Sequence, residues 1–167
     1  MRMTPSLTLL TAAAMAALAS PVKRQGVPPT TSEDSGIITA PANNTNAPAN
    51  TTIPFGVQFA PHDKNVCHGA YSSVDIYILA HQPTTADLNS TFGFSDYLHY
   101  FGRYIFANEP GLPPIGTPPP STLTMPDLGA EYNGESVFLA VVEEINDCPP
   151  LDYTDYSIDF RALGYFR

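Results

Sequence analysis

Apolar and polar residues alternate along much of this chain with a period of two, which is the pattern of half-buried β-strands. The alternation is clearest in VDIYILA, where Val74, Ile76 and Ile78 would share one face of a strand. Similar alternation, or a short apolar run bounded by turn residues, gives six predicted strands, at residues 37–41, 52–59, 74–80, 121–126, 136–143 and 156–166. Polar loops rich in Pro and Gly separate them, so the pattern predicts an all-β chain.

The segment SDYLHYFGRYIFAN, residues 95–108, fits two kinds of element. Tyr97, Tyr100 and Tyr104 have helical spacing, and Ser95 could cap such a helix at its N-terminus. Aromatic residues favour strands, however, and Gly102 disfavours a helix interior. We predict a strand here and keep a helix as the alternative.

These elements indicate a fold class. About seven short strands over roughly 130 residues, without the alternation of strands and long helices that a parallel sheet needs, favour antiparallel pairing. The predicted fold is an antiparallel two-sheet sandwich of the immunoglobulin or fibronectin-III kind. A chain of this length is expected to form one domain around one core.

The N-terminus has the features of a secretory signal. The apolar stretch 7–18 is too short to span a bilayer, and Ala17 and Ala19 fit a signal-peptidase site after Ala19. The dibasic pair Lys23-Arg24 predicts a second cleavage, the alternative being two ordinary surface charges. The expected organisation is a signal peptide at 1–19, a propeptide at 20–24, a flexible Pro/Ser/Thr-rich leader at 25–35 and a β-sandwich domain at 36–167.

The expected mature chain is strongly acidic. Without residues 1–24 it holds sixteen acidic residues against four basic ones, Lys64, Arg103, Arg161 and Arg167, for a net charge of −12. Nucleic acids and anionic membranes repel such a chain. We therefore expect no nucleic-acid partner and no membrane span, and a secreted, extracellular location.

The cysteines and three sequons agree with that location. Cys67 and Cys148 are the two cysteines, and an oxidising compartment favours a disulfide between them, which the chain-entropy model values at roughly 4 kcal/mol. A free nucleophilic thiol beside His68 is the alternative. The sequons for N-glycosylation begin at Asn43, Asn50 and Asn89.

Candidate catalytic groups fall short of any known arrangement. The pentapeptide 93–97 has Tyr97 where a G-x-S-x-G nucleophile turn needs its second glycine. Glu143 and Glu144 are neighbours on a predicted strand, so they would point to opposite faces and could not flank one glycosidic bond. We therefore expect no enzyme activity, and keep a hydrolase of unrecognised type, acting on an extracellular polymer, as the alternative.

Candidate metal ligands are equally weak. His62, Asp63 and His68 match no zinc spacing. A fungal copper monooxygenase needs a histidine as its mature first residue, whereas Gln25 or Ser20 would stand there. The aspartates near the C-terminus lack the Gly and the Glu of an EF-hand loop; they are Asp147, Asp152, Asp155 and Asp159. We expect no metal and no cofactor.

The best candidate binding surface is the aromatic segment 95–108. If it is a strand, its alternation places Tyr97, His99, Phe101 and Arg103 on one face. Tyrosine and arginine together can stack on sugar rings or on an aromatic partner. The alternative is a role in the core, because a chain without Trp fills its interior with Phe and Tyr.

Parts of the sequence resemble known fungal proteins. The stretches GIITAPANNTNAPANTTIPF, VDIYIL, YLHYFGRYIFAN and PPPSTLTMPDL resemble small secreted fungal proteins of uncharacterised function. The first two predicted strands also resemble, more loosely, the immunoglobulin-like N-terminal domain of Ser/Thr-rich fungal cell-wall proteins linked to glucan assembly. These resemblances imply a cell-surface setting and supply no catalytic residue.

We therefore expect a secreted, monomeric protein without catalytic activity. It would act as an extracellular or cell-wall-associated structural or binding protein. Its expected partner is a cell-wall polysaccharide, a host surface or an extracellular protein.

Overall fold

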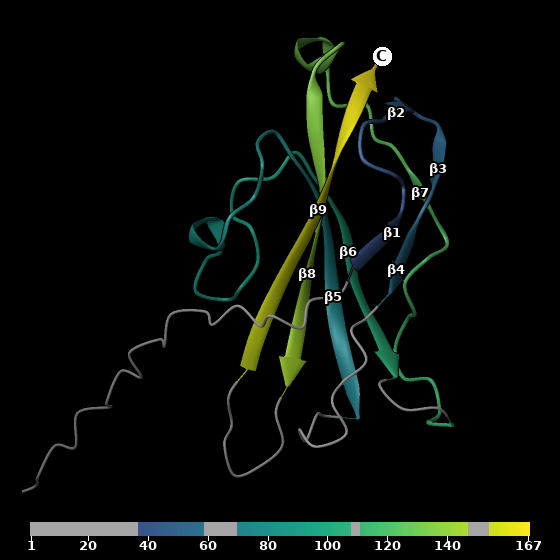
Figure 1. Cartoon of the computed structure of the whole chain (residues 1–167), viewed down its shortest axis with the longest axis vertical. Helices are drawn as coiled ribbons and strands as arrows, with labels where there is room; N and C mark the ends of the chain where they lie inside the picture. The colour runs from purple at the N-terminus through teal and green to yellow at the C-terminus, as the bar shows by residue number, and fades with distance from the viewer. Residues whose placement is uncertain (1–36, 59–69, 108–110, 147–153) are drawn as a thin grey trace, which may run out of the picture.

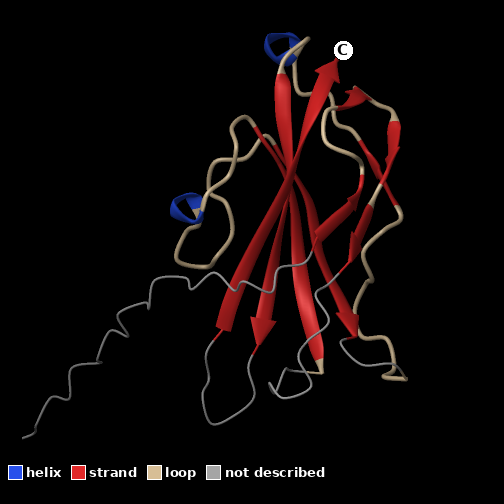
Figure 2. Cartoon of the chain, viewed as in Figure 1, coloured by secondary structure: helices blue, strands red, loops and turns tan. Residues whose placement is uncertain are grey.

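The computed structural model describes residues 37–58, 70–107, 111–146 and 154–167. The described chain is all-β, with two short 3₁₀ helices in its loops (Figures 1 and 2). Its elements are β1 (Ile37–Ala40), β2 (Thr45–Pro48), β3 (Thr52–Pro54), β4 (Gly56–Gln58), β5 (Tyr71–Leu79), η1 (Thr85–Asp87), β6 (His99–Ala107), β7 (Thr122–Thr124), η2 (Ala130–Tyr132), β8 (Ser136–Asn146) and β9 (Thr154–Phe166).

Five strands form the main sheet, in the order β2-β9-β8-β5-β6. The pairs are antiparallel except for β2, which runs parallel to the last part of β9 and places Thr45 opposite Leu163. The main sheet thus joins strands from both ends of the described chain, and β9 links β2 to β8, β5 and β6 (Figure 1).

Four short strands pack against one face of this sheet as two pairs, β1 with β4 and β3 with β7. β3 and β4 are the two halves of a single predicted strand, interrupted at Phe55. The Phe55 amide donates a hydrogen bond to the Ser121 carbonyl at 2.9 Å. The interruption allows the two halves to pair with different partners.

The larger hydrophobic core lies between these short strands and the main sheet. Val74, Ile76 and Ile78 of β5 are all fully buried on this side, as their alternation predicts. The buried members of the core are Ile38, Ala47, Ile53, Phe55, Val74, Ile76, Ile78, Leu123, Met125, Val137, Leu139, Val141, Leu163 and Tyr165. Removing such side chains from water is the main force that stabilises the fold.

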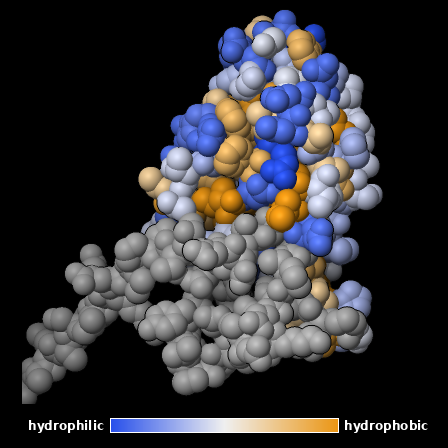
Figure 3. Space-filling view, in the orientation of Figure 1, coloured by the Kyte–Doolittle hydropathy of each residue, from blue (hydrophilic) through white to orange (hydrophobic). Residues whose placement is uncertain are grey.

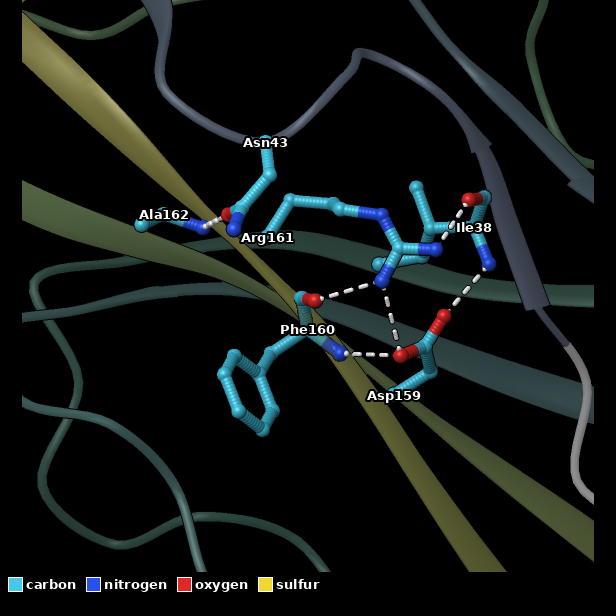
Figure 4. A network of polar contacts seen from close by, with 6 residues as sticks. All are labelled: Ile38, Asn43, Asp159, Phe160, Arg161 and Ala162. Atoms are coloured by element: carbon cyan, nitrogen blue, oxygen red, sulfur yellow. Dashed lines mark hydrogen bonds and ion pairs between the residues drawn. The ribbon is translucent and has the colours of Figure 1, made fainter.

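A polar clip from β9 holds β1 in place (Figure 4). Asp159 Oδ2 accepts a hydrogen bond from the Ile38 amide at 2.6 Å, and Arg161 Nη2 donates to the Ile38 carbonyl at 2.5 Å. Arg161 Nη1 also lies 3.0 Å from Asp159 Oδ1, which joins the two side chains in an ion pair. Both main-chain groups of Ile38 thus bind side chains of β9, and β1 is tied to the main sheet through them.

The surface toward the viewer in Figure 3 is chemically mixed. Apolar residues gather on both sides of a hydrophilic strip in the lower half of the described part. Polar residues predominate towards the end of the molecule at which β9 finishes.

The all-β prediction is confirmed, and each predicted strand has a counterpart in the structure. Within the ambiguous segment 95–108, residues 99–107 form strand β6, so the helical alternative is wrong. β2 was not predicted, because its sequence, TNAP, offers Ala47 as its one buried residue and shows no alternation. Its main chain, rather than its side chains, brings it to β9.

Candidate functional site

The main sheet carries a second apolar cluster on the face that points away from β1, β3, β4 and β7, here called the outer face. Its buried residues are Tyr77, Leu79, Phe94, Ala140, Val142 and Tyr156. Strands β5 and β8 are therefore apolar on both faces, which the sequence of β8 shows as a continuous apolar run. Something must cover part of the outer face to keep this cluster from water.

The connection between β5 and β6 supplies that cover. Phe94 meets Tyr77 edge to face with ring centroids 5.2 Å apart, and Phe92 stacks on Tyr156 at 3.8 Å. The Asn89 side-chain oxygen organises this loop by accepting hydrogen bonds from the Thr91 amide at 2.8 Å and from the Thr91 hydroxyl at 2.7 Å. The loop lies to the left of the main sheet in Figure 1. Next to β6 the outer face stays open, because Tyr97 and Tyr100 are exposed there.

Three tyrosines form a cluster at that open part, here called the tyrosine cluster. The ring of Tyr77 stacks on Tyr100 with centroids 4.9 Å apart, and Tyr97 lies 5.6 Å from Tyr77 and 6.1 Å from Tyr100. Tyr77 is buried, whereas Tyr97 is 46% exposed and Tyr100 38% exposed. Two aromatic rings are thus held at the surface by contact with a buried one.

A charged cluster adjoins the tyrosines and spans three strands. Arg103 of β6 reaches across β5, where it donates to Ser73 Oγ at 2.7 Å and lies 3.7 Å from Asp75 Oδ2, and it forms an ion pair with Glu144 of β8. Tyr100 joins the two clusters by donating a hydrogen bond from its hydroxyl to Asp75 Oδ1 at 2.6 Å. The Arg103 side chain remains 50% exposed, so its guanidinium is fixed in position and still reachable.

A β-bulge in β6 creates this arrangement. Ile76 lies opposite Gly102 and Tyr77 opposite Tyr100, so Phe101 is an extra residue between the two pairs. Residues three positions apart point to opposite faces of a regular strand, but the bulge brings Tyr100 and Arg103 to the same face. Gly102 has φ +127°, a backbone conformation that suits glycine.

Because of the bulge, the residues at the outer face differ from those predicted for the candidate binding surface. Tyr97 and Arg103 do lie at the outer face, together with Tyr100, which the alternation had placed on the other side. The expectation that His99 and Phe101 share this face is wrong. His99 lies opposite the core residue Ile78, Phe101 packs against the larger core, and their rings meet edge to face at 4.6 Å. Burial lowers the pKa of His99, consistent with an inward position.

The tyrosines of the outer face act as neutral hydrogen-bonding groups. Burial first, and then the charge of Asp75, raise the pKa of Tyr77 to about 12. Burial and the hydrogen bond to Asp75 raise the pKa of Tyr100 as well. Both phenols therefore keep their protons well above neutral pH.

These raised pKa values predict an alkaline instability. A raised folded-state pKa stabilises the protein below pH 10, the ordinary value for tyrosine, and this contribution is lost as the pH rises toward about 12. We expect the protein to unfold over this range, as followed by circular dichroism and tyrosinate absorbance. Tyr77→Phe should move the midpoint to higher pH, and an unchanged midpoint would exclude this cause.

Two of the three predicted sequons lie at exposed positions. Asn50 is exposed, and Asn43 is exposed while its side-chain oxygen accepts a hydrogen bond from the Ala162 amide at 2.7 Å (Figure 4). Asn89 is partly buried within the loop it organises. The other sites called from the sequence fall outside the described residues: Ala19, Lys23, Arg24, Cys67, Cys148, His62, Asp63, His68, Asp147 and Asp152.

Three candidate catalytic and metal groups, Glu143, Glu144 and Asp159, have structural partners. Glu143 is buried on the inner face, where it accepts a hydrogen bond from Ser157, while Glu144 lies on the outer face, so the two point apart as predicted. Asp159 belongs to the clip with Arg161. Within ranges 37–58, 70–107, 111–146 and 154–167, no group of three or more His, Cys, Asp or Glu side chains is placed to hold a metal ion.

Comparison with known proteins does not assign the chain to a family. No protein-family model, curated protein or solved structure matches this chain. Among the described residues, no helix has the length and apolar character needed to cross a membrane.

Proposed function

We propose that this is an extracellular binding protein without catalytic activity, which holds a polysaccharide against the open part of its outer face. The observation that carries the proposal is the pair of half-exposed rings, Tyr97 and Tyr100, fixed beside the ion pairs of Arg103. Aromatic rings pack against the C–H faces of sugars, and the neighbouring charged groups can bind hydroxyls. An open sheet face suits an extended polymer better than a small molecule that needs a deep pocket.

The rigidity of these groups supports the proposal. Tyr97 and Tyr100 both contact the buried Tyr77, and Tyr100 is also held by Asp75. A binding surface whose side chains are already fixed loses little conformational entropy when a ligand arrives. The surface is therefore organised before binding.

The proposed fold is an immunoglobulin- or fibronectin-III-like sandwich with a disulfide between Cys67 and Cys148. The strand register supports the pairing, because the start of β5 lies opposite the end of β8, with Ser73 facing Glu144. The connections that contain the two cysteines, β4 to β5 and β8 to β9, thus join the main sheet at the same end. Secretion, cleavage after Arg24 and glycosylation of the sequons belong to the same proposal.

The test uses protein secreted into culture medium. Its N-terminal sequence, its mass before and after glycosidase treatment, and thiol labelling under denaturing conditions check the start at Gln25, the glycans and the disulfide. The protein is then assayed for retention on a panel of insoluble and soluble polysaccharides. Retention on none of them would reject the proposed binding function.

Tyr97→Ala and Tyr100→Ala examine the site itself. Each variant should weaken polysaccharide binding about tenfold or more, because each removes one of the exposed stacking rings. The free energy of unfolding should fall by about 1 kcal/mol or less for Tyr97→Ala, since that ring is half exposed. Phe166→Ala is the matched control: Phe166 is similarly exposed at the end of β9, and this variant should bind normally. Equal binding by all three variants would rule out the tyrosine cluster.

A further inference from the structure

We infer that the ligand of the outer face is electrically neutral, and that Asp75 and Glu144 set this preference by neutralising Arg103. The inference rests on the proposed function and adds the class of polysaccharide. Arg103 is the basic residue that the described structure places on the outer face, and two carboxylates already surround it. The charged cluster therefore carries one excess negative charge.

The contacts of Arg103 leave its charge little available to an anion. Its Nε and Nη2 atoms face Asp75 and Glu144, and Nη2 also binds Ser73 Oγ. An anionic ligand would either displace a carboxylate held by the protein or lie beside two of them, and like charges at such short range are strongly unfavourable. The net charge of −12 expected for the mature chain adds repulsion at longer range, which salt screens.

A neutral sugar meets none of these costs. Its hydroxyls can donate to the outer lone pairs of Asp75 and Glu144 and accept from the exposed side of Arg103, so the ion pairs stay intact. Tyr77 and Tyr100 have raised pKa values, far above neutral pH, so these two phenols add no charge. Recognition should then depend little on ionic strength.

The other basic residues of the described chain do not change this picture. Arg161 belongs to the clip with Asp159 and Ile38, and Arg167 pairs with Asp127 at 3.1 Å. Arg161 lies opposite Leu139 on the inner face of the main sheet, and Arg167 follows the end of β9 beside Asp127, so neither supplies a positive charge to a ligand held at the tyrosine cluster.

The test compares two polymers with the same backbone and different charge, hydroxyethyl cellulose and carboxymethyl cellulose. Affinity electrophoresis or calorimetry with the full secreted chain should show the neutral polymer bound at least about tenfold more tightly than the anionic one. Binding of the neutral polymer should change less than about twofold between about 20 and 500 mM NaCl, since no ion pair forms with the ligand.

The double variant Asp75→Asn/Glu144→Gln tests the role of the carboxylates. Tyr100 donates to Asp75 and the Ser73 hydroxyl donates to Glu144 Oε2 at 3.0 Å, and the amide oxygens of the variant can still accept both hydrogen bonds. Arg103 is left unneutralised, so carboxymethyl cellulose should bind the variant about tenfold or more tightly than it binds the unmodified protein at low salt. Glu131→Gln/Glu135→Gln removes the same two charges from exposed positions before β8. This control should leave the preference for the neutral polymer unchanged.

The possible results separate the inference from the proposed function. If the unmodified protein binds carboxymethyl cellulose as well as the neutral polymer, or if both double variants gain equally, the inference is overturned while binding at the outer face stands. If the unmodified protein and Tyr100→Ala bind neither polymer, the proposed function fails for this class of polysaccharide, and the inference fails with it.

Discussion

Arg161→Met is expected to lower the free energy of unfolding by about 2–4 kcal/mol, because it leaves Asp159 without its cationic partner and the Ile38 carbonyl without its donor. Methionine keeps most of the apolar stem, so the change removes the contacts of the guanidinium and leaves the Asp159 carboxylate in place. Chemical denaturation followed by circular dichroism measures the loss. Hydrogen exchange should show the Ile38 amide, which Asp159 holds, losing protection before the core strands do.

Arg167→Met provides the matched control for the clip. Arg167 also forms an ion pair, with Asp127, but its side chain is 51% exposed, and surface pairs of this kind contribute about 1 kcal/mol or less. The two variants lose the same charge from neighbouring parts of the chain. If Arg161→Met costs no more than Arg167→Met, the clip does not hold β1 to the main sheet.

Gly102→Ala is expected to disturb both stability and binding. A Cβ at this position would meet the Tyr104 ring at 3.7 Å or more, which is ordinary contact, so the cost comes from the backbone angle of +127°. Such strain costs about 1–3 kcal/mol. Relief of the strain would remove the bulge and send Tyr100 or Arg103 to the opposite face, so polysaccharide binding should fall about tenfold or more.

Gly134→Ala separates these two effects. Gly134 also has a positive φ, +84°, and nothing lies within 4 Å of an added Cβ, but it precedes β8 at the far end from the charged cluster. This variant should lose stability to a similar degree and bind normally. Normal binding by Gly102→Ala would show that the bulge does not position the site.

The strands are predictable because apolar residues alternate with polar ones along them, and this alternation shows which face is buried. Val74, Ile76 and Ile78 reveal the inner face of β5 in the sequence itself, and the aromatic segment became a strand as its composition favours. The opposed directions of Glu143 and Glu144 followed from the same period of two. The alternation of apolar and polar residues is thus enough to locate strands in which every second side chain is buried.

The composition of the candidate site could not be predicted in the same way. A single inserted residue at Phe101 reverses the faces of everything before it in β6, and Gly102 alone gives no sign that it sits in a bulge rather than a turn. The outer-face cover depends on Phe92 and Phe94 meeting Tyr156 and Tyr77 across the sheet. The parallel pairing of β2 is likewise a contact between distant main chains, without a local signal.

The place of β9 also determines when the chain can fold. β1 and β2 are the first described strands to be synthesised, but their partners on β9 come last, and Ile38 and Asp159 are 121 positions apart. Contacts across such distances form slowly, because the intervening chain must first be brought together. β2 therefore stays without its sheet partner, and β1 without its clip, until residues 154–166 have been made.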